Sequence, residues 1–242
     1  MFEFSMDAHM HFDLYENRDE VLEYIESKKS YTIAVTNLPE LFQKYNRIYT
    51  NKKFVKIALG FHPELVEEYM NQQVLFRQLV DETRFIGEIG LDFANISDGE
   101  RNSQIAVFKN ILSWCTDKNK ILSVHSRAAS KEVVSLLDGF KGKVILHWYS
   151  GRIVDLETAL SRGYYFSINH QMIKSENGRK IVKKIPVDRI LIESDAPFTK
   201  GMESEYTLNF NEKVCLYLAN NYNQMVDMVK KRIKANFAEV LK

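Results

Sequence analysis

The chain has 242 residues, of which 45% are apolar, and its 33 basic and 32 acidic side chains leave a net charge of +1. The apolar share is ample for a sizeable core and favours a globular protein. The near-neutral charge excludes a global field that draws the chain to nucleic acid or membrane, so any polyanion must be held locally. Two cysteines, Cys115 and Cys215, are too few and too distant for a disulfide scaffold or a CxxC zinc cluster.

The N-terminal segment MFEFSMDAH lacks a basic region followed by a long apolar core. No run of the sequence approaches the roughly eighteen apolar residues of a membrane span. We therefore expect a protein that is neither exported nor membrane-bound, and the scarcity of cysteine fits a reducing cytoplasm.

Short β-rich runs alternate along the chain with amphipathic stretches of helical period. We expect eight strands, at residues 2–9, 31–37, 54–62, 84–92, 120–126, 143–150, 164–170 and 189–195. We expect helices at residues 17–29, 103–119, 130–140 and 153–163. The last two helices end near a glycine, the residue that commonly stops a helix.

The predicted strands indicate an α/β protein with a parallel sheet. Apolar runs such as RILI and KVIL suit strands that are buried on both faces, which need helical crossovers. Eight βα units of about thirty residues each match a compact (β/α)8 TIM barrel. No linker or long repeat divides the sequence, so we expect one domain over residues 1–242.

The six histidines follow the predicted strands. In MDAHMHFD, His9 and His11 are two residues apart, so both imidazoles project from one face of a strand. The other polar candidates lie at or near the ends of later predicted strands: His62, Glu88, His125, His147, His170 and Asp195. In a (β/α)8 barrel the active site lies at that end of the strands, so every histidine maps to one rim.

Imidazole and carboxylate groups in this number predict a divalent-metal site. Two ions need about six protein groups with one carboxylate shared between them, and six residues supply that number. They are His9, His11, Glu88, His125, His147 and Asp195. Such a pair of ions activates water for hydrolysis, most naturally of a phosphoester. Each residue alone also has a structural interpretation, such as core packing for His125 or a turn for Asp195, but six at one rim favour metal.

Six motifs, in order, resemble those of the TatD-like metal-dependent hydrolases. They are residues 6–13, GFHP (60–63), GEIGLDF (87–93), HSRAA (125–129), HWYSG (147–151) and ESDAP (193–197). The closing KANFAEVL (234–241) is similar to the terminal helix of that family. The resemblance implies an amidohydrolase-like TIM barrel that acts as a DNase with two divalent ions, Zn, Mn or Mg.

The same resemblance implies roles for single residues. His9, His11 and Asp195 are expected to hold one ion and His125 and His147 the second, with Glu88 as the bridge. Asp195 would also suit a base toward the attacking water, so Glu88 and Asp195 are the expected catalytic groups. His62, Asp92 and Arg127 are expected on the substrate side, with His62 and Arg127 as phosphate contacts.

The sequence lacks basic residues at several positions where members of the family commonly have them. Glu64 follows GFHP in place of a histidine, ANISDGE follows GLDF without a basic residue before Arg101, and FTKGMESEYTLNF (198–210) has a single lysine. Protein cations that contact DNA phosphates supply affinity through counterion release, so we expect few phosphate contacts in this chain. A strand end needs few such contacts, so we expect exonuclease-like action on single strands.

Two alternatives stay open at this point. One is a hydrolase of a small phosphoester or amide in a closed pocket. The other is a subunit of a multiprotein anti-phage complex with protein partners, since some divergent TatD-like proteins belong to defence systems of the Qat type.

Overall fold

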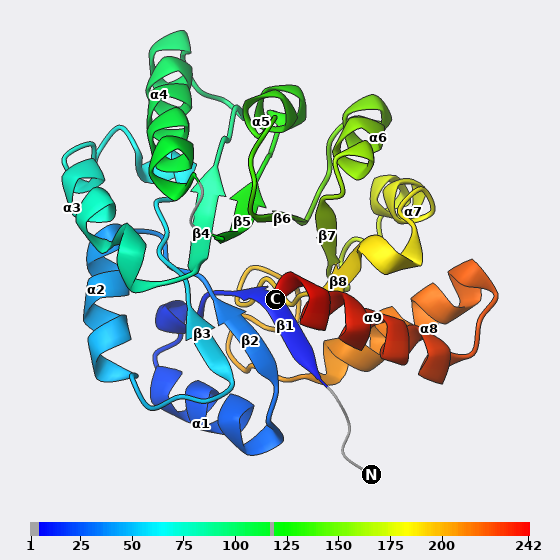
Figure 1. Ribbon diagram of the computed structural model, residues 1–242. Coiled ribbons are helices and arrows are strands. Elements are labelled where there is room, and N and C mark those ends of the chain that lie inside the picture. Colours follow the sequence, from blue (N-terminus) through cyan, green and yellow to red (C-terminus); the bar gives the residue numbers. More distant parts are fainter. Residues whose placement is uncertain (1–4, 117–118) are drawn as a thin grey trace. The chain divides into compact units, whose positions relative to one another are not determined.

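The structure is a computed structural model that describes residues 5–116 and 119–242. These residues form two compact units (Figure 1). The first unit comprises residues 5–34, 52–56 and 165–242, and the second comprises residues 35–51 and 57–164, in each case among the described residues.

Eight strands alternate with helices along the chain, as the sequence predicts. The strands are β1 (Met6–Met10), β2 (Tyr31–Ala34), β3 (Val55–Ile57), β4 (Phe85–Gly90), β5 (Ile121–His125), β6 (Lys143–His147), β7 (Tyr165–Ile168) and β8 (Ile190–Ile192). All eight predicted strands are confirmed, although each is shorter than predicted. Residues 2–4 of the first predicted strand lie outside the described part of the chain.

The four predicted helices are present, and the structure adds further helices. The helices are α1 (Arg18–Lys28), α2 (Pro39–Ile48), α3 (Gln72–Leu79), α4 (Asp98–Cys115), α5 (Ser130–Leu136), α6 (Ile153–Ser161), α7 (Glu176–Val182), α8 (Asn209–Tyr222) and α9 (Val226–Val240). The helix predicted at 103–119 corresponds to α4, and residues 117–118 lie outside the described residues. The terminal helix implied at residues 234–241 corresponds to the last part of α9. After α6 the chain reaches Gly163, whose φ of 79° suits the predicted glycine stop.

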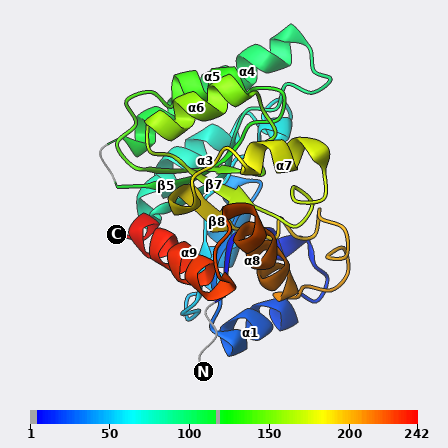
Figure 2. The ribbon, with the colours of Figure 1, turned by 90° about the vertical axis from the view of Figure 1, so that its right-hand side faces the viewer.

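The first unit holds two parallel strand pairs, β1 with β2 and β7 with β8. β1 also lies against β8, because the Asp195 N–H donates to the His9 carbonyl at 2.9 Å and the His11 N–H donates to the Ala196 carbonyl at 2.8 Å. Helices α8 and α9 pack against each other, and α9 packs on β8 (Figure 2). The hydrogen bonds of Asp195 and His11 hold the C-terminal end of β1 beside the residues that follow β8.

The second unit is built on β4, β5 and β6, which pair in parallel in that order. Its helices pack on their neighbours, α2 on α3, α3 on α4 and α5 on α6. All five residues of β1 and four of the five in β5 are buried, as expected of strands covered on both faces. Among the described residues, no helix is long and apolar enough to cross a membrane.

Candidate functional site

The first unit gathers two histidines and an aspartate. His9 lies in β1 and His11 directly follows the strand, and these residues are 0% and 1% exposed. Their Nε2 atoms lie 3.3 Å apart. The Oδ1 atom of Asp195 lies 3.6 Å from Nε2 of His9 and 3.7 Å from Nε2 of His11. The β1–β2 register shifts between Asp7 and Met10, the kind of irregularity that re-aims a side chain.

These three donor atoms fit a divalent ion. Ligands about 2.1 Å from an ion in a tetrahedral arrangement lie about 3.4 Å from one another. The observed separations of 3.3, 3.6 and 3.7 Å are close to that value. Two of them exceed the usual hydrogen-bond range, so direct hydrogen bonding explains the grouping less well than a shared ion does.

Asp7 holds the two strand ends that carry this group, and the sequence analysis did not give it a role. Its Oδ1 accepts the Ser194 N–H at 2.8 Å and the His9 N–H at 3.2 Å. Its Oδ2 accepts the hydroxyls of Ser194 at 2.5 Å and Tyr206 at 2.8 Å. Burial outweighs these hydrogen bonds and raises the pKa of Asp7 to about 6. The signal was present in the sequence, because Asp7 precedes His9 by two residues and so shares its face of β1.

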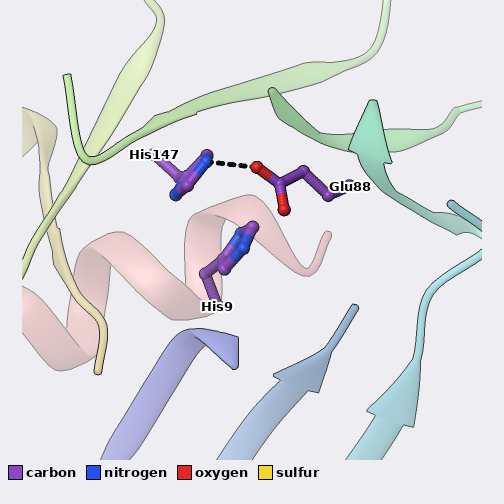
Figure 3. A group of neighbouring side chains, drawn as sticks. All are labelled: His9, Glu88 and His147. Carbon is purple, nitrogen blue, oxygen red and sulfur yellow. Dashed lines mark hydrogen bonds and ion pairs between the residues drawn. The ribbon is translucent and has the colours of Figure 1, made fainter. Parts of the chain in front are cut away.

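The second unit gathers three histidines around Glu88 of β4. Its Oε1 lies 2.7 Å from Nε2 of His147, and Figure 3 shows that imidazole facing the carboxylate. The same oxygen lies 2.7 Å from Nδ1 of His125 and 3.5 Å from Nε2 of His62. Nδ1 of His125 and Nε2 of His147 are 3.3 Å apart, again near the separation of two ligands on one ion.

Two glycines lie where neighbouring main chains pass too close for a Cβ atom. A Cβ on Gly60 would lie 1.6 Å from the Thr36 carbonyl oxygen, so only glycine fits in GFHP. Gly90 ends β4 with a φ of 134°, and a Cβ there would lie 2.1 Å from the His125 carbonyl oxygen. The glycines of GFHP and GEIGLDF therefore let the loops and strands that carry the second group come together.

A chain of hydrogen bonds leads outward from His125. Its Nε2–H donates to Oδ2 of Asp92 at 2.7 Å, so Nδ1, which lies 2.7 Å from Oε1 of Glu88, is the nitrogen that could bind an ion. Burial lowers the pKa of His125, but the hydrogen bonds and charges of Asp92 and Glu88 outweigh it and raise the value to about 9. Arg127 donates from Nε to Asp92 at 2.8 Å, so one carboxylate holds both an imidazole and a guanidinium.

His62 lies beside Glu88 with one ring nitrogen already in a hydrogen bond. Its Nδ1 accepts the backbone N–H of Glu64 at 3.2 Å. The proton of a neutral ring is therefore on Nε2, the atom that faces Glu88. His62 also forms, with Glu88 and His125, a group whose ligand atoms all lie within 4.8 Å of one another, and its role as a phosphate contact stays a prediction.

The placement of the predicted residues differs from the sequence analysis in several details. His62 does not end a strand, because β3 stops at Ile57 and the chain then makes a loop before Pro63, which has no N–H for a ladder. Asp195 follows β8 by three residues. Arg127 lies beyond β5, which ends at His125, and His170 lies beyond β7, which ends at Ile168.

His170 joins neither group. Its ring Nε2–H donates to the Lys200 carbonyl at 2.9 Å, and burial as the largest cause lowers its pKa. The bond anchors the segment after β8, which is a structural role.

Comparison with known proteins identifies the family. The family model of TatD-related DNases matches residues 6–242. The chain belongs to this family. It is 29% identical to an uncharacterized metal-dependent hydrolase of Methanocaldococcus jannaschii over 83% of this chain and 82% of that protein. It is 28% identical to the deoxyribonuclease TATDN3 of Homo sapiens over 79% of this chain and 77% of that protein.

Solved structures show the same fold. The crystal structure of YJJV, a TatD homolog from Escherichia coli, matches with a TM-score of 0.85 at 19% identity, over 99% of this chain and 98% of that one. A TatD-family hydrolase from Entamoeba histolytica matches with a TM-score of 0.80 at 15% identity, over 98% of each chain. The predicted amidohydrolase-like (β/α)8 fold is confirmed, and family membership makes this TatD chain a metal-dependent hydrolase that acts on ester bonds.

Proposed function

We propose that this TatD-family hydrolase is a deoxyribonuclease that removes nucleotides from the ends of single strands with two divalent ions. The observation that carries the proposal is the chain from Glu88 through His125 and Asp92 to Arg127. The buried Asp92 carboxylate lies 2.7 Å from Nε2 of His125, a candidate metal ligand, and 2.8 Å from Nε of Arg127. Nδ1 of His125 lies 2.7 Å from Glu88. A guanidinium held in this way suits a phosphate close to the ion, because its planar fork binds two phosphate oxygens.

Each unit supplies ligands for one ion in this proposal. His9, His11 and Asp195 would hold the first, and His125 and His147 would hold the second. Glu88 would be the carboxylate shared by the ions, a role that stays a prediction. Zn, Mn and Mg are the candidate metals, since imidazole and carboxylate together suit this range.

The protein groups have distinct tasks in the hydrolysis. Bound divalent ions supply Lewis-acid polarisation of the phosphoryl oxygen and a lower pKa for water. Asp195 accepts one proton of the attacking water, whose oxygen bonds to phosphorus as the ester phosphorus–oxygen bond breaks. The leaving oxygen takes up a proton, so the products are a phosphate monoester and a hydroxyl. Arg127 and the Nε2–H of His62 bind and orient the phosphate.

Preference for strand ends follows from the scarcity of cations. Glu64 accepts a hydrogen bond from Arg127 at 2.8 Å, so a substrate phosphate must compete with a carboxylate. Glu203 and Glu205 add negative charge after β8, opposed by Lys200. A long duplex needs an extended series of basic contacts, whereas a strand end needs only a few.

The Glu64–Arg127 pair also favours a second candidate, a hydrolase of a small phosphoester or amide. Such a substrate needs no basic groove. The anti-phage complex of the Qat type finds no support among these relatives.

The test uses purified protein stripped with a chelator and reloaded with Mg, Mn or Zn. End-labelled single and double strands are then digested and resolved by length. We expect metal-dependent stepwise shortening of the single strand from one end, with slower loss of the duplex. If no ion supports cutting of DNA while a small phosphoester or amide is hydrolysed, the second candidate replaces the first.

A further inference from the structure

Phe198 is a large apolar side chain exposed beside a candidate metal ligand. It follows Asp195 by three residues and is 60% exposed. Its ring lies edge-on to the buried His11 ring, with centroids 5.1 Å apart and planes at 85°. A single exposed phenylalanine is common on protein surfaces, so its meaning depends on this position.

Two hydrogen bonds hold the main chain that leads into Phe198. The Phe198 N–H donates to the Asp195 carbonyl at 2.9 Å, and the Ala196 carbonyl accepts the His11 N–H at 2.8 Å. Pro197, with its fixed φ, lies between them. The backbone that carries the ring is thus tied to Asp195 and His11, two candidate ligands, and the ring itself is exposed to solvent.

We infer that Phe198 is the stacking surface for a nucleobase next to the phosphate that is cut. The inference rests on the proposed deoxyribonuclease function and adds a substrate contact to it. Every base has a π-face, so an exposed aromatic ring grips single-stranded nucleic acid without reading its sequence. Such a contact supplies affinity that does not depend on cations, and the segment that begins with Phe198, residues 198–210, contains Lys200 as its single basic residue.

A stacking role and a covering role make different predictions. If Phe198 only covers His11 from water, its removal should change metal binding and affect every substrate equally. If it stacks on a base, its removal should weaken the binding of substrates that carry bases. The binding of a strand with the same phosphates but no bases should stay the same. Stacking on an aromatic side chain changes affinity by about 5- to 150-fold per base, which corresponds to about 1 to 3 kcal/mol.

The experiment compares wild type, Phe198→Ala and Phe198→Trp, with Leu216→Ala of α8 as the control for loss of an exposed apolar side chain, since Leu216 is 47% exposed. Binding of a fluorescent single strand with nuclease-resistant phosphorothioate linkages is measured by anisotropy. A fully abasic strand of equal length is measured in parallel, and the metal content of each variant is determined.

We expect Phe198→Ala to weaken binding of the base-bearing strand about 5- to 150-fold and to change binding of the abasic strand less than about twofold. Phe198→Trp should keep wild-type binding, and metal content should be the same throughout. Equal weakening on both strands, no weakening, or loss of metal would overturn the inference. If wild type neither binds nor cuts single strands, the proposed function itself has failed; if it cuts them but Phe198→Ala shows no base dependence, only the stacking role has.

Discussion

Arg127 donates a hydrogen bond to Glu64 at 2.8 Å, and the two side chains are about half exposed. The Glu64 carboxylate therefore accepts a hydrogen bond from the same guanidinium that the proposed mechanism uses to bind a substrate phosphate. Since the pair is accessible to water, its net contribution is about 0.2 to 1 kcal/mol, small enough for a phosphate to displace it.

Replacing Glu64 should strengthen the binding of single-stranded DNA. Glu64→Gln and Glu64→His each remove the competing charge, so affinity should rise by about 1.5- to 5-fold. Wild type should contact two or three phosphates, giving a slope of log affinity against log salt of about −1.4 to −2, and Glu64→Gln should steepen it. Titrations at four salt concentrations measure both quantities, with the exposed Glu67→Gln as the control. Unchanged affinity and slope would show that Arg127 does not bind phosphate.

Arg127→Lys should impair substrate use more than metal binding. Lysine offers a point charge in place of a fork, so the bidentate grip on phosphate is lost while the local charge remains. KM for a single strand should rise by about tenfold, since hydrogen bonds to charged groups contribute about 1.5 kcal/mol or more. Steady-state kinetics and metal analysis on the same preparation separate the two effects. Loss of metal with unchanged KM would assign Arg127 a structural role through Asp92.

The double variant His9→Ala, His11→Ala should lose one of two ions and keep its fold. Both side chains are buried ligands of the same proposed ion, whereas the strand pairing of β1 rests on main-chain hydrogen bonds. Metal content per chain and far-ultraviolet circular dichroism are the measurements. His170→Gln is the matched control, because His170 is a buried histidine outside both groups. Unchanged stoichiometry in the double variant would refute the ligand assignment.

The sequence predicts the strands better than the helices. Strands such as β5, β6 and β8 contain apolar runs that stand out from their surroundings, and in β5 the residues Ile121, Leu122 and Val124 are all buried. Helices such as α3 and α7 are only 8 and 7 residues long, too short for a clear helical period. Their positions depend on packing against neighbours rather than on local pattern.

For the candidate site, the residue types were predictable and their local geometry was not. The HxH pair and the ESDAP motif indicate ligands, because their spacing is short and their chemistry is distinctive. The tautomer of His62 and the pairing of Glu64 with Arg127 depend on a loop after β3 whose path is set by tertiary contacts. The single-domain expectation over residues 1–242 and the cytoplasmic location stay predictions.

Asp7 should make the stability of the metal-free protein fall as pH rises from about 4 to 7. Burial raises its pKa from 3.8 to about 6, so in this window the folded state binds more protons than the unfolded state. The difference corresponds to a loss of about 3 kcal/mol that is complete above the folded pKa. Asp7→Asn should remove this slope, as measured by urea unfolding with a chelator at pH 4.5 and 7.5. The exposed Asp19→Asn is the control, and an unchanged slope in Asp7→Asn would show that Asp7 stays ionised throughout.

Hydrolysis of an end-labelled single strand by Glu88→Gln, measured beside wild type after reloading with the same ion, tests the proposed metal-dependent mechanism most directly. The substitution keeps the shape of a residue that is 2% exposed but removes the negative charge proposed to serve both ions. We expect wild type to cut in the presence of metal, Glu88→Gln to be slower by about two orders of magnitude or more, and the exposed Glu157→Gln to match wild type. Wild-type turnover by Glu88→Gln, at equal protein folding and metal supply, would contradict a role for this carboxylate in the reaction.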